Sequence, residues 1–187
     1  MKLKRIISTF AVMLVLGVLA GSVLRVRFPQ LPVWEMPVLS YGMHVSRDAF
    51  LPVFRETAIW SVLWLAAFAM TGLTLLAVPG VLMLWLLLGV RVGAVLGAMY
   101  SEVHLLGFVI AAGFMIPYVL ASAALFLVAS REALRSGICL MKAVRGRGAE
   151  RLSFRAYALR YLVLGAGMLL LALLHGFWMG WLLPLLI

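Results

Sequence analysis

Residues 57–100 form one almost uninterrupted apolar run, which is broken only at its middle by Pro79-Gly80. A straight helix of these 44 residues would be about 66 Å long. The hydrocarbon core of a bilayer is only about 30 Å thick. The run therefore has to cross a membrane twice, and we expect the chain to turn at Pro79-Gly80. This pattern predicts an integral membrane protein rather than a soluble domain.

The composition of the whole chain agrees with this prediction. Of its 187 residues, 66% are hydrophobic and 12% are charged, whereas about 25% of the residues of a soluble domain are charged. The apolar runs are continuous, while the strands of a membrane barrel alternate between apolar and polar residues. We therefore predict an all-α fold, a polytopic helical bundle that forms a single membrane domain over residues 1–187.

The apolar runs and the charges between them define five membrane spans. These spans cover Ile6–Leu24, Ala58–Val78, Val81–Tyr100, Leu105–Ser130 and Tyr161–Leu183. Lys2, Lys4 and Arg5 precede the first span, and eight more cations lie in the segment 131–160. We expect these eight to fix the topology and to contact anionic lipids; they are Arg131, Arg135, Lys142, Arg145, Arg147, Arg151, Arg155 and Arg160. The positive-inside rule then places the N-terminus and residues 131–160 in the cytoplasm and the C-terminus outside.

Two segments have two interpretations each. The cations before the first span, its apolar run and Val18-Leu19-Ala20 also fit a cleaved signal peptide. We favour a retained anchor, because an apolar run of 19 residues is long for a signal peptide. Residues 25–57 form the one sizeable outer segment, in which four prolines oppose a long regular helix. This segment is either a linker along the membrane surface or a docking surface for an outside partner.

Sequence motifs for catalysis are missing. The chain has no H-E-x-x-H, C-x-x-C or G-x-S-x-G motif and no phosphate-binding glycine loop. Its six acidic residues fall in predicted loops or at span ends. We therefore expect no enzymatic activity, no cofactor and no metal. The net charge of +10 does not indicate a nucleic-acid interface, because the basic residues flank apolar runs. Cys139 is interpreted as a small apolar helix residue.

Gly89, Gly93 and Gly97 recur at four-residue spacing in the third span. This spacing places the three glycines on one stripe of a helix, where another backbone can approach closely. We expect the stripe to pack against another helix of the bundle, and self-association of two copies is the alternative.

Arg91 lies near the middle of the third span, where an arginine costs about 2.5–3.5 kcal/mol on insertion scales. With no carboxylate expected at that depth, we hypothesise that its guanidinium donates to carbonyls freed at a kink between Gly113 and Pro117. The alternative is that Arg91 extends toward an interface. His175, in the last span, is interpreted as a hydrogen-bonded packing residue.

The ordered motifs of residues 50–187 resemble the stage II sporulation protein M family. The resemblance rests on V-P-G at Val78–Gly80, the glycine-rich helix Gly89–Gly97, and G-F-M-I-P-Y at Gly113–Tyr118. It extends to Arg160-Tyr161 and to Pro184. Members typically carry a glutamate shortly before the final proline, where this chain has Met179-Gly180, and residues 25–57 also diverge.

The resemblance implies a function in the bacterial plasma membrane. It implies a scaffold in engulfment during endospore formation that holds peptidoglycan-degrading partners, stage II sporulation proteins D and P. A competing interpretation is a permease or channel-like subunit of a transporter, with Arg91 and the expected kink lining a pathway. A continuous polar cavity would favour transport, and a sealed bundle would favour a scaffold.

Overall fold

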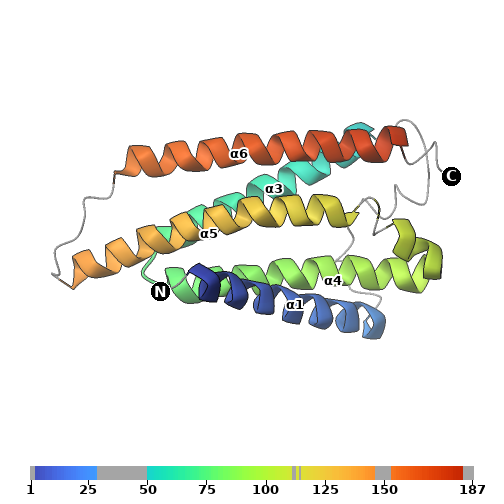
Figure 1. Cartoon of the computed structure of the whole chain (residues 1–187), viewed down its shortest axis with the longest axis horizontal. Helices are drawn as coiled ribbons and strands as arrows, with labels where there is room; N and C mark the ends of the chain where they lie inside the picture. The colour runs from blue at the N-terminus through green and yellow to red at the C-terminus, as the bar shows by residue number, and fades with distance from the viewer. Residues whose placement is uncertain (1–2, 29–49, 111–112, 114, 146–152, 183–187) are drawn as a thin grey trace.

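The computed structural model describes residues 3–28, 50–110, 113, 115–145 and 153–182. Within these ranges the chain is helical and contains no strand (Figure 1). The helices are α1 (Leu3–Arg27), α3 (Phe50–Gly72), α4 (Ala77–Ile110), α5 (Ile116–Val144) and α6 (Phe154–Phe177), and α6 continues as a π-helical turn over Trp178–Leu182. Each of the five helices contains a segment long and apolar enough to cross a membrane. The all-α prediction is confirmed for these residues, and the five helices fit a multi-pass membrane protein.

The helices run along one common direction and pack as two pairs. Helix α1 lies along α4, α3 lies along α6, and α5 contacts both pairs (Figure 1). The start of α1, the α3–α4 connection and the end of α5 lie at one end of the bundle. The first and last described residues therefore lie at opposite ends, as five crossings require. Which end faces the cytoplasm stays a prediction from the charges.

The turn between the second and third spans is not at Pro79-Gly80. Helix α3 ends at Gly72, and backbone bonds from Leu73 to Met70 (3.0 Å) and from Thr74 to Thr71 (3.1 Å) close the turn. The Gly80 amide already donates to the carbonyl of Leu76 at 2.9 Å. Pro79 lies in the first turn of α4, where its missing N–H is not needed. The predicted position of the turn is therefore wrong by a few residues.

Other predicted helix ends also need correction. The expected outer turn at 101–104 does not exist, because α4 continues to Ile110 and α5 begins only at Ile116. Residues 101–104 contain no glycine or proline that would end a helix. Helix α3 begins at Phe50 rather than Ala58, and α6 begins at Phe154 rather than Tyr161.

The start of α6 has a specific local cause, which hydropathy does not detect. The Ser153 side chain caps the helix by accepting a hydrogen bond from the Ala156 amide at 3.3 Å. Because α5 continues to Val144 and α6 begins at Phe154, much of the predicted basic segment 131–160 is helical. The described part of the outer segment 25–57 is likewise helical at both ends, and its residues 29–49 lie outside the described ranges.

A layer of aromatic side chains closes the bundle between α1, α3, α4 and α5. The rings of Phe10 and Trp85 stack with centroids 5.5 Å apart, and Phe68 lies 6.3 Å from Trp85 and 5.5 Å from Phe126. Trp85 Nε1 donates to Ser130 Oγ at 2.8 Å. We call Phe10, Phe68, Trp85 and Phe126 the aromatic layer; all four are less than 5% exposed.

Two tyrosines of α6 extend this core toward the connection between α5 and α6. Tyr157 Oη donates to the Ala69 carbonyl of α3, and Tyr161 Oη donates to the Ala129 carbonyl of α5, both at 2.8 Å. Their rings also pack together, with centroids 4.8 Å apart. Helix α6 is thus fixed to both neighbours by polar contacts inside an otherwise apolar region.

The glycine stripe of α4 packs against α1. A Cβ at Gly93 would lie 2.7 Å from the Cα of Val18, and one at Gly17 would lie 2.8 Å from the Cα of Gly89. Ser22 Oγ donates across the interface to the Gly93 carbonyl at 2.9 Å. The residue numbers rise together along both helices, so α1 and α4 are parallel. Because α1 covers the stripe, a second copy cannot use it for self-association.

Candidate functional site

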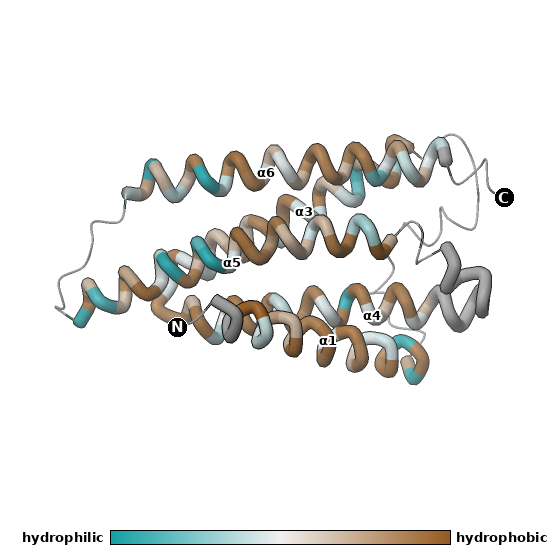
Figure 2. The backbone as a smooth tube through the Cα atoms, viewed as in Figure 1, coloured by the Kyte–Doolittle hydropathy of each residue, from teal (hydrophilic) through white to brown (hydrophobic). Residues whose placement is uncertain are grey.

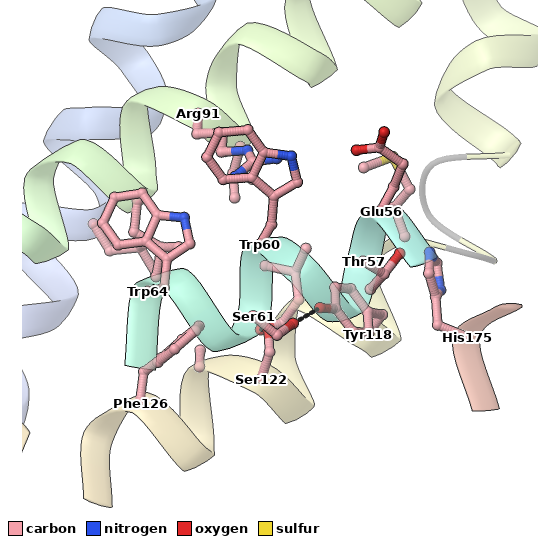
Figure 3. A pocket seen from close by; sticks show the side chains of 16 residues that line it. Glu56, Thr57, Trp60, Ser61, Trp64, Arg91, Tyr118, Ser122, Phe126 and His175 are labelled. Carbon is pink, nitrogen blue, oxygen red and sulfur yellow. Dashed lines mark hydrogen bonds between the residues drawn. The ribbon is translucent and has the colours of Figure 1, made fainter. Parts of the chain in front are cut away.

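Side chains from all five helices line one cavity of about 70 Å³ beside the aromatic layer (Figure 3). Leu14 of α1 and several apolar residues of α3, α4 and α5 form most of its wall. Its polar side chains come from four helices: Glu56, Thr57 and Ser61 of α3, Arg91 of α4, Tyr118 and Ser122 of α5, and His175 of α6. Ionisable residues inside a membrane bundle commonly mark a functional site. We therefore treat this cavity as the candidate site and call it the polar cavity.

Arg91 contacts an aromatic ring rather than a carbonyl. Its guanidinium carbon Cζ lies 3.7 Å from the centre of the Trp60 ring, as Figure 3 illustrates. A cation–π contact contributes about 0.5–2 kcal/mol, which offsets part of the insertion cost of an arginine. The hypothesis of a Gly113–Pro117 kink is wrong in its premise, since Pro117 stands in the first turn of α5. Gly113 lies outside the regular helices, and no atom of the described residues lies within 4 Å of its Cβ position.

A carboxylate does lie near Arg91, contrary to our expectation. Glu56 lines the same cavity, one helical turn before Trp60 on α3. The predicted start of the second span at Ala58 places Glu56 in the outer segment. Helix α3 begins eight residues earlier, with Pro52 in its first turn, so Glu56 is part of the bundle.

The opposite wall of the polar cavity is a short chain of polar contacts. Ser61 Oγ and Tyr118 Oη share a hydrogen bond of 2.9 Å. The Tyr118 ring stacks on the His175 ring with centroids 4.4 Å apart. His175 is 6% exposed and packs against tyrosine inside the bundle as predicted, but it forms no hydrogen bond with a described residue, so that part of the prediction is wrong. Pro117 lies behind this pair, in a separate groove of about 170 Å³ between α5 and α6.

The polar cavity ends at the aromatic layer. Phe126 lines the cavity and also packs on Phe68, which in turn packs on Trp85. Beyond these rings lies the apolar core that includes Tyr161 and Met168. In the described helices the cavity is therefore closed on this side rather than continued toward the α3–α4 turn.

The predicted basic residues lie mainly at one end of the bundle. Arg131, Arg135 and Lys142 belong to the second half of α5, Arg145 caps its end, and Arg155 and Arg160 belong to the start of α6. Figure 2 shows hydrophilic residues on both helices at this end. Arg160 forms an ion pair with Glu132. Arg147 and Arg151 lie outside the described residues.

The partners of Arg91 and of the α4 glycines also carry signals in the sequence, which the predictions above do not include. Glu56 with Trp60 and Thr57 with Ser61 repeat at four-residue spacing, which places polar groups on one face of an apolar helix. Gly17 and Gly21 show the same small-residue spacing as the α4 stripe. Both signals were present in the sequence, and both point toward helix faces that the structure buries in the bundle.

The comparisons with known proteins add no further assignment. Neither the models of protein families, nor the characterised proteins, nor the solved structures contain a match to this chain.

Proposed function

We propose that this chain is a non-enzymatic integral membrane scaffold of a complex that remodels peptidoglycan in a bacterial plasma membrane. The process we propose is engulfment during endospore formation, with peptidoglycan-degrading proteins as partners. The resemblance of residues 50–187 to stage II sporulation protein M supports this proposal. The structural observation that carries it is the aromatic layer, which closes the polar cavity and leaves a tightly packed bundle.

A scaffold has to hold its docking surface in a fixed position. The proposed docking surface is the outer segment 25–57, which connects α1 to α3. Helix α1 is held against α4 by close backbone contacts, and the start of α3 packs against Gly176 and Gly180 at the end of α6. Both attachment points of the segment are therefore fixed to the bundle at the same end.

Site-specific photocrosslinking tests this proposal in cells undergoing engulfment. A photoreactive amino acid at Leu51, 67% exposed at the start of α3, is expected to capture peptidoglycan-degrading proteins. The matched control is Val144, 71% exposed at the opposite end of the bundle, where no such protein is expected. Mass spectrometry identifies the captured proteins. Capture of a cytoplasmic ATPase at Val144, with no wall-degrading protein at Leu51, would contradict the proposal.

The polar cavity favours a second candidate function, a permease or channel-like transport subunit. Arg91, Glu56 and His175 surround a space in the bundle, as in a substrate site. For a scaffold, ion and proton flux through liposomes containing the purified protein should equal the flux through empty liposomes. A flux that depends on the protein and disappears in the Arg91→Gln variant would favour transport and overturn the scaffold.

A further inference from the structure

The hydrogen-bonding capacity of the polar cavity is largely unused. The guanidinium of Arg91 carries five N–H donors. Its guanidinium lies over the face of Trp60 and forms no hydrogen bond with any of the described residues. His175 is 6% exposed, and in the same ranges its ring nitrogens have no hydrogen-bond partner. Arg91 and His175 thus line the cavity without a hydrogen bond to any described residue.

The cavity also holds a negative charge that does not pair with Arg91. The carboxylate of Glu56 accepts hydrogen bonds and cannot donate them when ionised. Within the described part of the chain, no ion pair of 4.0 Å or less joins Glu56 to Arg91. The site therefore presents a separated cation and anion. A ligand that complements it carries both charges, with an anionic oxygen for Arg91 and an N–H donor for Glu56.

The surroundings of the two charges indicate where this ligand comes from. Trp60 covers Arg91 and is 42% exposed. It lies in α3, a helix that is long and apolar enough to cross a membrane, so its exposed side would face lipid. Most of the remaining wall is apolar and includes Leu88, Val92 and Met115. The volume of about 70 Å³ is several times the ~10–15 Å³ that one water needs. This space suits a small polar head group, while acyl chains stay against the outer surface of the helices.

We propose that the polar cavity binds the head group of a zwitterionic phospholipid that carries a primary amine. The phosphate accepts from Arg91, and the ammonium donates to Glu56. A quaternary ammonium fits less well because it has no N–H donor. A phosphate with no amine leaves Glu56 unpaired and places a second negative charge beside it. This inference concerns the cavity alone and does not depend on the scaffold function.

Native mass spectrometry of the purified full-length protein tests this inference. The probes are phosphatidylethanolamine, phosphatidylglycerol and phosphatidylcholine with identical acyl chains. We expect one phosphatidylethanolamine to be retained per chain, with at least about tenfold preference over the other two lipids, since each of these lacks the charge-assisted hydrogen bond from an ammonium N–H to Glu56. Equal retention of all three lipids, or preference for phosphatidylglycerol, would overturn the proposal.

Substitutions locate the binding in the cavity. Arg91→Gln should reduce phosphatidylethanolamine binding about tenfold or more. Glu56→Gln should remove the preference over phosphatidylglycerol. The matched control is Arg55→Gln. Arg55 is an exposed arginine of α3 that does not line the cavity, so this variant should leave the binding of all three lipids unchanged. Arg91→Lys, which keeps the charge, replaces Arg91→Gln if the latter does not fold. Equal losses in the Arg55 and Arg91 variants would contradict the assignment.

Discussion

Replacing Trp85 with alanine is expected to destabilise the bundle more than any other single truncation of a side chain. Trp85 is 2% exposed, stacks on Phe10, packs on Phe68 and donates to Ser130. Because lipid is as apolar as the core, the destabilisation comes mainly from the lost packing contacts and the lost hydrogen bond. Truncating a buried tryptophan costs about 3–5 kcal/mol, which corresponds to a midpoint about 6–20 °C lower. Thermal unfolding in detergent measures this shift.

Two further variants separate the contributions of Trp85. Trp85→Phe keeps an aromatic ring in the layer and removes the donor to Ser130, so it should lose about 0.5–1.5 kcal/mol. Trp181→Ala is the control for removal of an indole, because Trp181 is 63% exposed and its main ring contact is Phe177. It should shift the midpoint far less. Equal shifts for the Trp85→Ala and Trp181→Ala variants would show that the aromatic layer does not hold the helices together.

The number of helices was predictable, while their ends were not. Hydropathy over about 20 residues finds a span regardless of its partners, which is why the described part of the chain contains the five apolar helices that we expect. Helix ends depend on local features that hydropathy does not detect. Ser153, for example, starts α6 by capping it. Pro79 lies in the first turn of α4, a position that suits proline as well as a turn between helices does.

Half of the candidate site was recognisable and half was not. Arg91 and His175 are recognisable from the sequence because polar residues within apolar runs are rare. Glu56 is not recognisable as a site residue, because the predicted second span begins at Ala58 and leaves it outside the bundle. The contact between Arg91 and Trp60 could not be predicted, because it depends on how α3 and α4 are rotated about their axes. That rotation follows from packing, in which the α1–α4 glycine interface takes part.

Gly93→Ala is the most direct test of that interface. At Gly93 an added methyl group would lie 2.7 Å from the Cα of Val18 and still closer to its carbonyl oxygen, which is too close for atoms that cannot move aside. Helix α1 must shift away from α4, and the hydrogen bond from Ser22 to the Gly93 carbonyl is then lengthened. Overpacking of this kind costs about 1–3 kcal/mol, so the midpoint of thermal unfolding should fall by about 2–12 °C.

Gly165→Ala is the matched control, because it makes the same chemical change inside another helix. Among the described residues, a Cβ at Gly165 would meet Leu65 Cδ2 alone, at 3.6 Å, an ordinary contact with the end of a side chain. Alanine is favoured over glycine in a helix by up to about 1 kcal/mol, so this variant should be as stable as the unchanged protein or more stable. The two substitutions should thus shift the midpoint in opposite directions. If both stabilise the protein, α1 does not pack on the α4 glycines, and the rotation of α4 that directs Arg91 toward Trp60 must have another cause.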